Sequence, residues 1–416
     1  MTKKSDAPAI RFKGFSDAWE QRKLGELVDR VVRKNTNNES TLPLTISAQY
    51  GLVDQITYFN NRVASRDVSN YYLVLNGEFA YNKSTSDGYP FGAVKRLDLY
   101  EKGVLSTLYI VFAPKKEQQI DSDYLTVFFD TDRWHKGVAE RAAEGARNHG
   151  LLNISAEDFF DIDLSVPKDI VEQKQIGAFI RQLDNLITLH QRKFEKLTNV
   201  KKSMLEKMFP QNGSSYPEIR FKGFTDAWEQ RKFSELVQIE RGGSPRPIDD
   251  FITDAPNGLN WVKIGDAPTQ GNYITKTAEK IRPEGLSKTR EVHPGDLILS
   301  NSMSFGKPYI MGIDGCIHDG WLLIRNTYGV FDLTFLCHLL GTPQMLSQYR
   351  SLAAGSTVNN LNKELVGNTV VTIPSITEQR VLGDYLEQLD NLITLHQREL
   401  EKLQNIKKSM LEKMFV

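Results

Sequence analysis

The sequence has few cysteines and no long apolar run. Among 416 residues only Cys316 and Cys337 are cysteines, too few for a disulfide framework. No apolar segment approaches the roughly 18 to 20 residues that span a bilayer, and residues 1–6 lack the apolar core of a secretory signal. We therefore expect a cytoplasmic protein of two or three domains.

The sequence also lacks an excess of charge of either sign. Lys and Arg together number 52, and so do Asp and Glu, so the net charge is zero. A strongly basic domain is the usual sign of a DNA-binding protein. If this chain binds DNA, its phosphate contacts must therefore be local, or partner subunits must supply much of the positive charge.

Several catalytic and cofactor motifs are absent. There is no Pro-Pro dipeptide, which excludes the Asp/Asn-Pro-Pro-aromatic motif of adenine methyltransferases. There is no nucleotide-binding P-loop, because Gly306-Lys307 is followed by Pro308. Arg241-Gly242-Gly243-Ser244 lacks the glycine spacing and strand context of a cofactor fingerprint. We expect no catalytic or cofactor-binding residue and infer a binding subunit, not an enzyme.

One set of residues has the composition of a zinc site. Cys316, His318, Cys337 and His338 are residue types that bind zinc. Cys337 and His338, however, are adjacent on a predicted helix, where neighbouring side chains point about 100° apart. We expect an ordinary core cysteine and a surface histidine here, and no metal site.

Two blocks of sequence each occur twice. An opening motif at residues 10–23 recurs at residues 219–232 with one serine replaced by threonine. A second block at residues 182–209 recurs at residues 388–415. The chain is therefore two halves, each with an opening motif, a variable segment and a repeated block.

The variable segments, residues 24–163 and 233–372, have similar lengths but little sequence in common. A solenoid would repeat throughout its length, so that architecture is excluded. Near-identical frames around unlike segments indicate one scaffold that carries two different recognition domains.

Each repeated block predicts a long helix. The blocks follow Pro167 and Pro374, and Glu172 and Glu378 fall in the first turn, where the helix dipole favours acids. Apolar residues then recur at heptad spacing, which predicts a coiled coil of two helices, each about 57 Å long. The residues assigned to this seam or to a partner are Leu183, Leu186, His190, Leu197, Met204, Leu389, Leu392, His396, Leu403 and Met410.

The middle of the heptad pattern is polar. His190 lies near Lys193, and His396 near Glu399. This pattern fits either a solvated helix face with two tolerated histidines or a polar layer that sets the register. We expect the methionines near the helix ends to line the seam, and the Lys-Lys pairs at residues 201–202 and 407–408 to be solvated.

Both variable segments predict α+β domains with the same order of elements. Each has a strand entered through a Gly-acid turn, a later strand, a helix and then a glycine-containing loop. The predicted fold is thus two α+β target-recognition domains alternating with two long helices in an antiparallel coiled coil, with pseudo-two-fold symmetry. The predicted boundaries are 1–165 and 212–372 for the domains, and 166–211 and 373–416 for the helices.

Two loops in each variable segment carry side chains that hydrogen-bond to bases or phosphates. One follows the Gly-acid strand, and the other is the glycine-containing loop. Such loops are most often only turns, but they recur at the same place in both halves. The candidate DNA-binding residues are Lys83, Ser84, Arg141, Arg147, Asn148, His149, Asn301, Ser302, Ser356, Thr357, Asn359 and Asn360.

The repeats resemble those of the specificity subunits of type I restriction–modification enzymes. The resemblance is carried by the Phe-Lys-Gly-Phe and Ala-Trp-Glu-Gln-Arg-Lys motif and by Leu183-Asp184-Asn185-Leu186-Ile187-Thr188, and it covers essentially the whole chain. It implies that each domain recognises half of a bipartite DNA site and that the helices act as spacer and docking surface. It also implies two methyltransferase subunits with S-adenosylmethionine, which methylate adenine, and two restriction subunits that use ATP and Mg.

Two other functions are compatible with parts of the sequence. A structural coiled-coil adaptor with two protein-binding domains would explain the helices, although the Arg- and Asn-bearing loops disfavour it. A standalone methyltransferase is disfavoured by the missing catalytic motif. The target bases cannot be deduced from the sequence.

Overall fold

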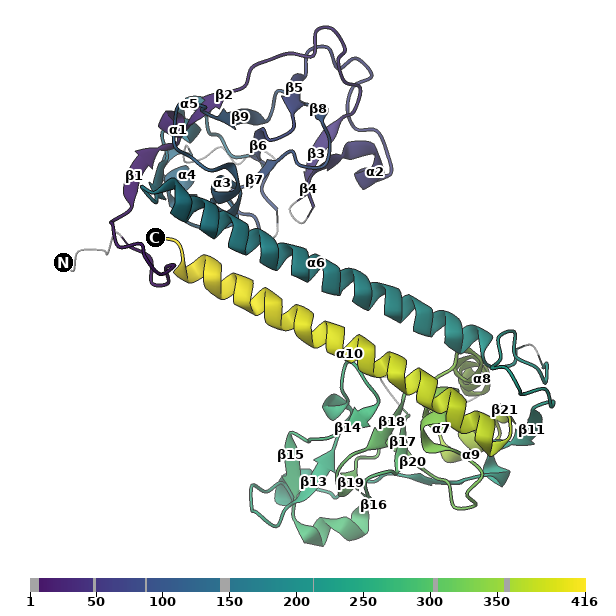
Figure 1. Cartoon of the computed structure of the whole chain (residues 1–416). Helices are drawn as coiled ribbons and strands as arrows, with labels where there is room; N and C mark the ends of the chain where they lie inside the picture. The colour runs from purple at the N-terminus through teal and green to yellow at the C-terminus, as the bar shows by residue number, and fades with distance from the viewer. Residues whose placement is uncertain are drawn as a thin grey trace. The chain divides into compact units, whose positions relative to one another are not determined.

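The structure is a computed structural model of the whole chain, and it describes residues 7–47, 50–86, 88–142, 150–211, 213–301, 306–354 and 360–416. The chain forms two compact units (Figure 1). Unit 1 comprises Met1–Leu189 and Glu401–Val416, and unit 2 comprises His190–Leu400. Each unit therefore contains one variable segment and parts of both long helices, so the units do not coincide with the four predicted segments.

Unit 1 contains a four-stranded sheet of order β2-β9-β6-β7 and three two-stranded sheets, β1-β10, β3-β4 and β5-β8. Its elements before the long helix are β1 (Glu20–Lys23), α1 (Leu24–Leu27), β2 (Val28–Arg30), β3 (Leu44–Ser47), β4 (Gly51–Asp54), α2 (Gln55–Phe59), β5 (Tyr72–Leu75), β6 (Phe79–Asn82), β7 (Ala93–Arg96), β8 (Lys102–Leu105), β9 (Ile110–Pro114), α3 (Ser122–Phe128), α4 (His135–Arg141), α5 (Ala156–Phe160) and β10 (Asp163–Val166).

Unit 2 contains a five-stranded sheet of order β12-β20-β17-β18-β14, a four-stranded sheet of order β15-β13-β19-β16 and the pair β11-β21. Its elements are β11 (Glu229–Lys232), η1 (Phe233–Glu235), β12 (Gln238–Arg241), η2 (Ile248–Asp250), β13 (Leu259–Val262), η3 (Ile264–Asp266), β14 (Tyr273–Ile274), β15 (Glu279–Ile281), η4 (Pro283–Lys288), β16 (Arg290–Val292), β17 (Leu297–Ser300), β18 (Pro308–Met311), β19 (Gly315–Ile317), β20 (Trp321–Arg325), α7 (Leu333–Leu340), α8 (Pro343–Ala354), α9 (Lys363–Gly367) and β21 (Val370–Ile373).

The two domains share a core topology, as the sequence predicted. The order β2-β9-β6-β7 in unit 1 corresponds to β12-β20-β17-β18 in unit 2, and every neighbouring pair in both sets is antiparallel. In both domains the strand entered through the Gly-acid turn, β6 or β17, lies inside the sheet. The domains differ in the strands added around this core.

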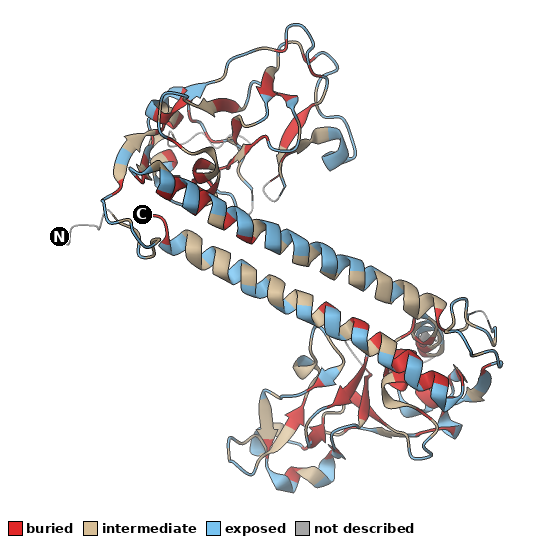
Figure 2. Cartoon of the chain, in the orientation of Figure 1, coloured by how far each residue is buried: buried red, intermediate tan, exposed pale blue. Residues whose placement is uncertain are grey.

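The long helices are α6 (Ile170–Lys207) and α10 (Ile376–Lys413), each of 38 residues. Unit 1 packs the start of α6 against the end of α10, and unit 2 packs the end of α6 against the start of α10, so the helices run antiparallel (Figure 1). Buried residues concentrate in the first half of each helix, where it lies against its own domain (Figure 2).

The residues assigned to the seam or to a partner differ in burial. Leu183 and Leu389 are buried, while Leu197, Met204, Leu403 and Met410 are partly buried against the cores of their units. Leu186 and Leu392 were assigned to the second seam position but are 43% and 44% exposed. Ile180, Leu386 and Ile393, which directly follow other residues at the second seam position (Phe179 and Tyr385) or Leu392 itself, are buried.

The Glu-Gln pair at the start of each long helix fastens that helix to its domain. Gln173 donates to the Pro167 carbonyl at 2.8 Å and accepts from the backbone amide of the N-cap residue of α3 at 2.8 Å. Gln379 makes the same two contacts, to the Pro374 carbonyl at 3.1 Å and to the N-cap residue of α7 at 2.9 Å. The helix dipole alone therefore does not explain this sequence pair, because the glutamine side chains make tertiary contacts.

The preceding glutamates bind the opening motifs. Arg11 donates two hydrogen bonds to Glu172, at 2.6 and 2.8 Å, and Arg220 donates two to Glu378, at 2.7 and 2.8 Å. Glu172 is fully buried. The bidentate pairing of a buried carboxylate gives the contact a defined geometry, and it explains why this arginine appears in both opening motifs.

The opening motifs also bind the end of a long helix. The Ile10 amide donates to the Lys413 carbonyl at 2.9 Å in unit 1, and the Ile219 amide donates to the Lys207 carbonyl at 2.9 Å in unit 2. The tryptophan of each motif packs edge-on against a buried phenylalanine that follows the helix. Each unit is therefore closed by the same contacts, although its helix end comes from a different part of the chain.

Two lysines that were expected to be solvated are ion-paired. Lys407 binds Asp184 at 2.7 Å and Asp130 at 3.6 Å, and Lys201 pairs with Asp390. Asp184 and Asp390 occupy equivalent positions in the repeated blocks. The expectation was wrong for Lys201 and Lys407, because an acid on the facing helix lies beside each of them, but Lys202 and Lys408 are exposed.

The two seam histidines meet in unit 2. The Nδ1 atoms of His190 and His396 lie 3.1 Å apart, with the rings edge to face. One nitrogen must donate and the other accept, so the contact requires that one Nδ1 carry no proton. This contact supports the register-setting alternative for the polar layer.

We expect this histidine pair to make the stability of the chain sensitive to pH. Burial, and then the charges of His190 and Lys193, lower the pKa of His396. A histidine with a lowered pKa in the folded state stabilises the fold above its ordinary pKa of 6.5 and loses that contribution as the pH falls further.

The measurement is the melting temperature of the wild type and of a His190→Leu/His396→Leu variant between pH 8 and 5. Other histidines titrate in both proteins, so the difference between the two is the quantity of interest. We expect the variant to gain on the wild type below about pH 6.5. A difference that stays constant with pH would show that the pair does not titrate with folding.

Candidate nucleic-acid interface

In unit 1 the described ends of the two loops singled out from the sequence are hydrogen-bonded to each other. The loop after β6 and the segment after residue 149 are joined by the Thr85 amide, which donates to the Gly150 carbonyl at 2.7 Å. The Leu152 amide donates to the Lys83 carbonyl at 3.0 Å. Ser84 is exposed between them, and Lys83 is half-buried with its ammonium group 3.4 Å from the Ile154 carbonyl.

Unit 2 brings the corresponding loops together. The Leu361 amide donates to the Asn301 carbonyl at 3.0 Å, which joins the loop after β17 to the segment that follows α8. Asn360, next to this contact, is exposed. In both domains, therefore, a residue just after the equivalent strand (β6 or β17) is hydrogen-bonded to a residue at or just past the end of the glycine-containing loop.

Asn301 has a structural role in this contact. Its side chain is 4% exposed and donates to the Asp319 carbonyl at 2.8 Å, while its amide donates to the Gly320 carbonyl at 2.9 Å. A side chain so enclosed holds its loop in place and has little surface left for a base. Asn301 remains a predicted DNA-binding residue. Asn360 is exposed and is therefore more accessible to DNA.

Several of the predicted residues lie outside the described part of the chain. These residues are Arg147, Asn148, His149, Ser302, Ser356, Thr357 and Asn359. They adjoin described residues of the paired loops, and their selection rests on the sequence alone.

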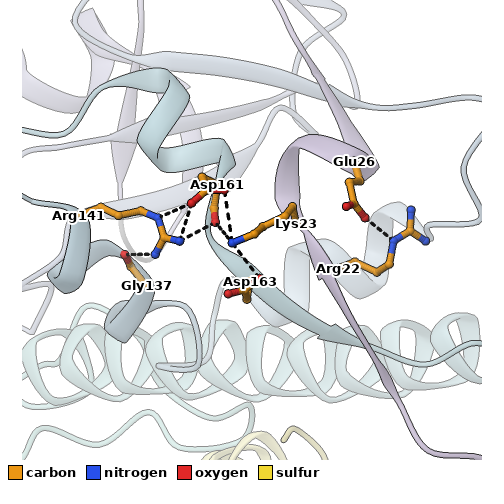
Figure 3. A network of polar contacts seen from close by, with 7 residues as sticks. All are labelled: Arg22, Lys23, Glu26, Gly137, Arg141, Asp161 and Asp163. Atoms are coloured by element: carbon orange, nitrogen blue, oxygen red, sulfur yellow. Dashed lines mark hydrogen bonds and ion pairs between the residues drawn. The ribbon is translucent and has the colours of Figure 1, made fainter.

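Arg141 ends α4, immediately before the glycine-containing loop of unit 1, and it is bound within the chain (Figure 3). Its guanidinium group donates to the Asp161 carboxylate at 2.7 and 3.2 Å, to the Asp161 carbonyl at 2.8 Å and to the Gly137 carbonyl at 3.1 Å. Lys23 approaches the same carboxylate at 3.3 Å. Hydrogen bonds from Arg141 and then from Lys23 lower the pKa of Asp161.

This network ties α4 to the strand pair β1-β10, because Lys23 ends β1 and also binds Asp163 at 3.1 Å (Figure 3). Arg141 therefore fixes the point where the loop begins. In unit 2 the helix before the equivalent loop is fixed differently, by Gln348, which exchanges two hydrogen bonds with the Val370 backbone at 2.9 and 3.0 Å.

We expect Arg141→Ala to weaken recognition by unit 1 without changing the salt dependence of DNA binding. Loss of a phosphate contact would lower the salt slope by about 0.9, whereas a lost positioning contact leaves it unchanged. Asp161→Asn is the matched variant: it weakens the same network but removes a negative charge. Tighter DNA binding by Asp161→Asn, with a smaller slope in Arg141→Ala, would assign Arg141 to a phosphate.

The cysteines are buried, and one predicted surface histidine is not at the surface. Burial raises the pKa of the Cys316 thiol to about 11 and that of Cys337 to about 12. His338 is 5% exposed, and burial lowers its pKa to about 4. The expectation of a surface histidine was therefore wrong, because the whole of α7 from Phe335 onward is enclosed.

Two further features bear on function. Among the described residues, no group of three or more His, Cys, Asp or Glu side chains could hold a metal ion. None of the helices in the described ranges combines the length and the apolar character needed to cross a membrane.

Two topologically similar domains, each packed on both of the long antiparallel helices, define a protein of duplicated architecture. The sequence pattern described as "Type I restriction modification DNA specificity domain" matches the chain twice, at residues 17–199 and 225–405. The chain therefore belongs to the family of type I restriction–modification specificity subunits.

Comparisons with individual proteins agree with this family. The chain is 24% identical over 371 residues to the type I restriction enzyme MjaVIII specificity subunit of Methanocaldococcus jannaschii, covering 85% of this chain and 82% of the relative. It shares its fold with the crystal structure of a type I restriction–modification S subunit from M. genitalium, at 12% identity, a TM-score of 0.63 and 99% coverage of both chains. A structure from a study of complex assembly in a type I system matches at 17% identity and a TM-score of 0.50, covering 95% of this chain and 97% of the other.

Proposed function

We propose that this chain recognises a bipartite double-stranded DNA sequence, one half with each domain, and directs adenine methylation and ATP-dependent restriction by partner subunits in the cytoplasm. The chain itself would contribute no catalytic group. The observation that carries the proposal is the pairing of the two loops. In both domains, backbone hydrogen bonds join the described ends of the same two loops on the same topological core, and the two pairs of loops differ in sequence. Equal frames with unequal loops suit the recognition of two different half-sites.

The partners would be two methyltransferase subunits, which would carry S-adenosylmethionine, and two restriction subunits, which would use ATP and Mg. Phosphate contacts shared with these partners would account for the zero net charge of the chain.

Exposed leucines on the long helices support the docking of two equal partners. Unit 1 presents Leu186 and Leu189 on α6, at 43% and 46% exposure. Unit 2 presents Leu392 and Leu395 on α10, at 44% and 51% exposure. The two pairs occupy equivalent positions in the repeated blocks. Clustered exposed apolar side chains mark interaction surfaces, so each unit would bind one methyltransferase subunit.

We expect Leu186→Asp/Leu189→Asp to remove one of the two methyltransferase subunits, because the added charges would have to be buried at the interface. Native mass spectrometry of the purified complex measures the stoichiometry. Leu392→Asp/Leu395→Asp should remove the other subunit. Thr188→Asp, which adds a charge on another face of α6, is the control. Two bound subunits in both leucine variants would place the docking surface elsewhere.

The test of the function is methylome sequencing of a host that expresses the chain with its methyltransferase and restriction subunits. We expect a single bipartite motif with methylated adenines, and no methyl transfer by the chain alone. Methylation by the isolated chain would make it an enzyme. Failure of the purified complex to retain DNA would favour the alternative, an adaptor with two protein-binding domains.

A further inference from the structure

Unit 2 contains a pocket of about 670 Å³ that the recognition surface does not use. Its floor is one face of the sheet β15-β13-β19, where Trp261 pairs across the strands with Glu279 and Cys316. Lys263 and His318 lie two residues further along their strands and line the same pocket. The volume is in the range of sites that enclose small molecules, roughly 300 to 1,000 Å³.

The wall above this floor is the segment after Arg241, which begins with Gly242 and Gly243. A Cβ on Gly242 would lie 2.2 Å from the His318 carbonyl, and one on Gly243 would lie 2.3 Å from the Lys288 carbonyl. The Gly242 amide also donates to the Trp321 carbonyl at 2.9 Å. Only glycine allows the backbone to pass so close, so the wall that begins at Ser244 is held firmly against the sheet.

The pocket shares a wall with the candidate DNA interface. His318 lines the pocket, and its Nδ1 accepts a hydrogen bond from the Gly320 amide at 3.0 Å. The next contacts in the same segment are those that hold Asn301, from its amide to the Gly320 carbonyl and from its side chain to the Asp319 carbonyl. A ligand in the pocket would therefore lie close to the contacts that hold Asn301, the residue that follows β17.

The charges around the pocket cancel. Arg246 and Lys263 are matched by Asp249 and Glu279, and Lys263 forms an ion pair with Glu279. A site for a phosphate or a carboxylate would show an excess of positive charge. The balance here favours an uncharged ligand.

The remaining lining is that of a site for a flat, polar ring. Ile248, Ile252 and the buried Trp261 supply apolar surface, and the His318 ring stands 5.6 Å from that of Trp261. Ser244 also lines the pocket, and its hydroxyl has no hydrogen-bond partner among the described residues. A buried polar group left in this state points to a missing ligand or water.

We propose that this pocket binds a single unpaired nucleobase. An uncharged ring with donors and acceptors on its edge matches the apolar floor, the balanced charges and the free hydroxyl. The base could come from two sources, a nucleotide turned out of the DNA at the second half-site or a free nucleoside. The DNA source rests on the proposed function, because it requires that unit 2 bind a duplex.

Substitution of 2-aminopurine at each position of the second half-site tests the DNA source, with the complete complex as the protein. The fluorescence of this base rises when it leaves the stack. We expect a several-fold rise at one position besides the methylated adenine, and the loss of that rise in Ile252→Trp, whose indole fills the pocket. The rise at the methylated adenine should not change, and the first half-site scanned in the same way is the control.

Calorimetric titration with each of the four nucleosides tests the free source. Binding by the wild type that Ile252→Trp abolishes, without any additional bright position in DNA, would assign the pocket to a free nucleoside. The absence of both signals, or an additional signal that persists in Ile252→Trp, would overturn the proposal.

Two further measurements keep the result interpretable. A cooperative thermal transition of Ile252→Trp at the melting temperature of the wild type shows that the variant is folded. Glu279→Gln changes the polar edge without filling the pocket, and it should change which base binds best. If methylome sequencing shows a normal bipartite motif while both base signals are absent, the pocket proposal fails and the proposed function stands.

Discussion

Replacement of residues 24–163 by the corresponding segment of another family member will change one half of the methylated sequence and leave the other half and the spacing unchanged. The structure gives a physical reason for these junctions. Lys23 and Asp163 are paired residues at the end of the antiparallel ladder β1-β10, so the segment enters and leaves unit 1 at adjacent points. The contacts of Arg11 with Glu172 and of Ile10 with Lys413 lie outside the exchanged segment and persist.

The original half-site should no longer be methylated, because each base pair that does not match the new domain weakens DNA binding by about 1 to 3 kcal/mol. Residues 233–370 provide the matched exchange, since Lys232 and Val370 are paired residues at the end of the equivalent ladder β11-β21. That exchange should change the other half-site. Methylome sequencing measures both. A change in both halves after one exchange, or in neither, would show that the domains do not act independently.

Lengthening the helix pair by one heptad will lengthen the unrecognised spacer between the half-sites by about three base pairs. Seven residues add about 10 Å to a helix, and DNA rises about 3.4 Å per base pair. Insertion in α6 alone would displace Lys201 from Asp390. The insertions therefore belong in both helices, after Leu189 and after Leu395, next to the His190–His396 contact.

A single heptad also turns the second half-site about a third of the way around the DNA, so activity should fall. Three heptads add about 32 Å, close to one turn of B-DNA at roughly 34 Å, so this variant should recover activity on sites with about nine additional base pairs. A variant in which one heptad is replaced without a change of length is the control. An active enzyme with three added heptads and an unchanged spacer would show that the helices do not set the distance.

The sequence carried most of the fold because the relevant signals are local or repeated. Tyr72–Leu75 and Trp321–Ile324 are continuous runs of apolar residues; the first forms β5 and the second forms all of β20 but its last residue. The repeated blocks contain no internal proline and keep their heptads, so α6 and α10 extend without a break for 38 residues each. Equal order of elements in the two segments was enough to predict a shared topology.

The site was predicted less completely. The sequence selected an equivalent pair of loops in each half, because glycine and small polar residues recur at equivalent places in the two halves. It did not show that the loops touch, since the hydrogen bonds from Thr85 to Gly150 and from Leu361 to Asn301 join residues about 60 apart in the chain. It also selected Asn301 and Arg141 by residue type, although neighbouring backbone and acid groups bind both side chains within the protein.

By itself, the sequence determined the tandem organisation, the two helices and the kind of domain between them, because periodicity and repetition need no knowledge of distant neighbours. Tertiary structure alone decided what each polar or apolar side chain meets. It paired Lys201 with Asp390, enclosed His338, and left Leu186, Leu189, Leu392 and Leu395 exposed while Leu183 and Leu389 on the same helices are buried. The physical reason is the same in each case: burial and pairing depend on which segments the fold brings together, and a side chain's own position in the sequence does not contain that information.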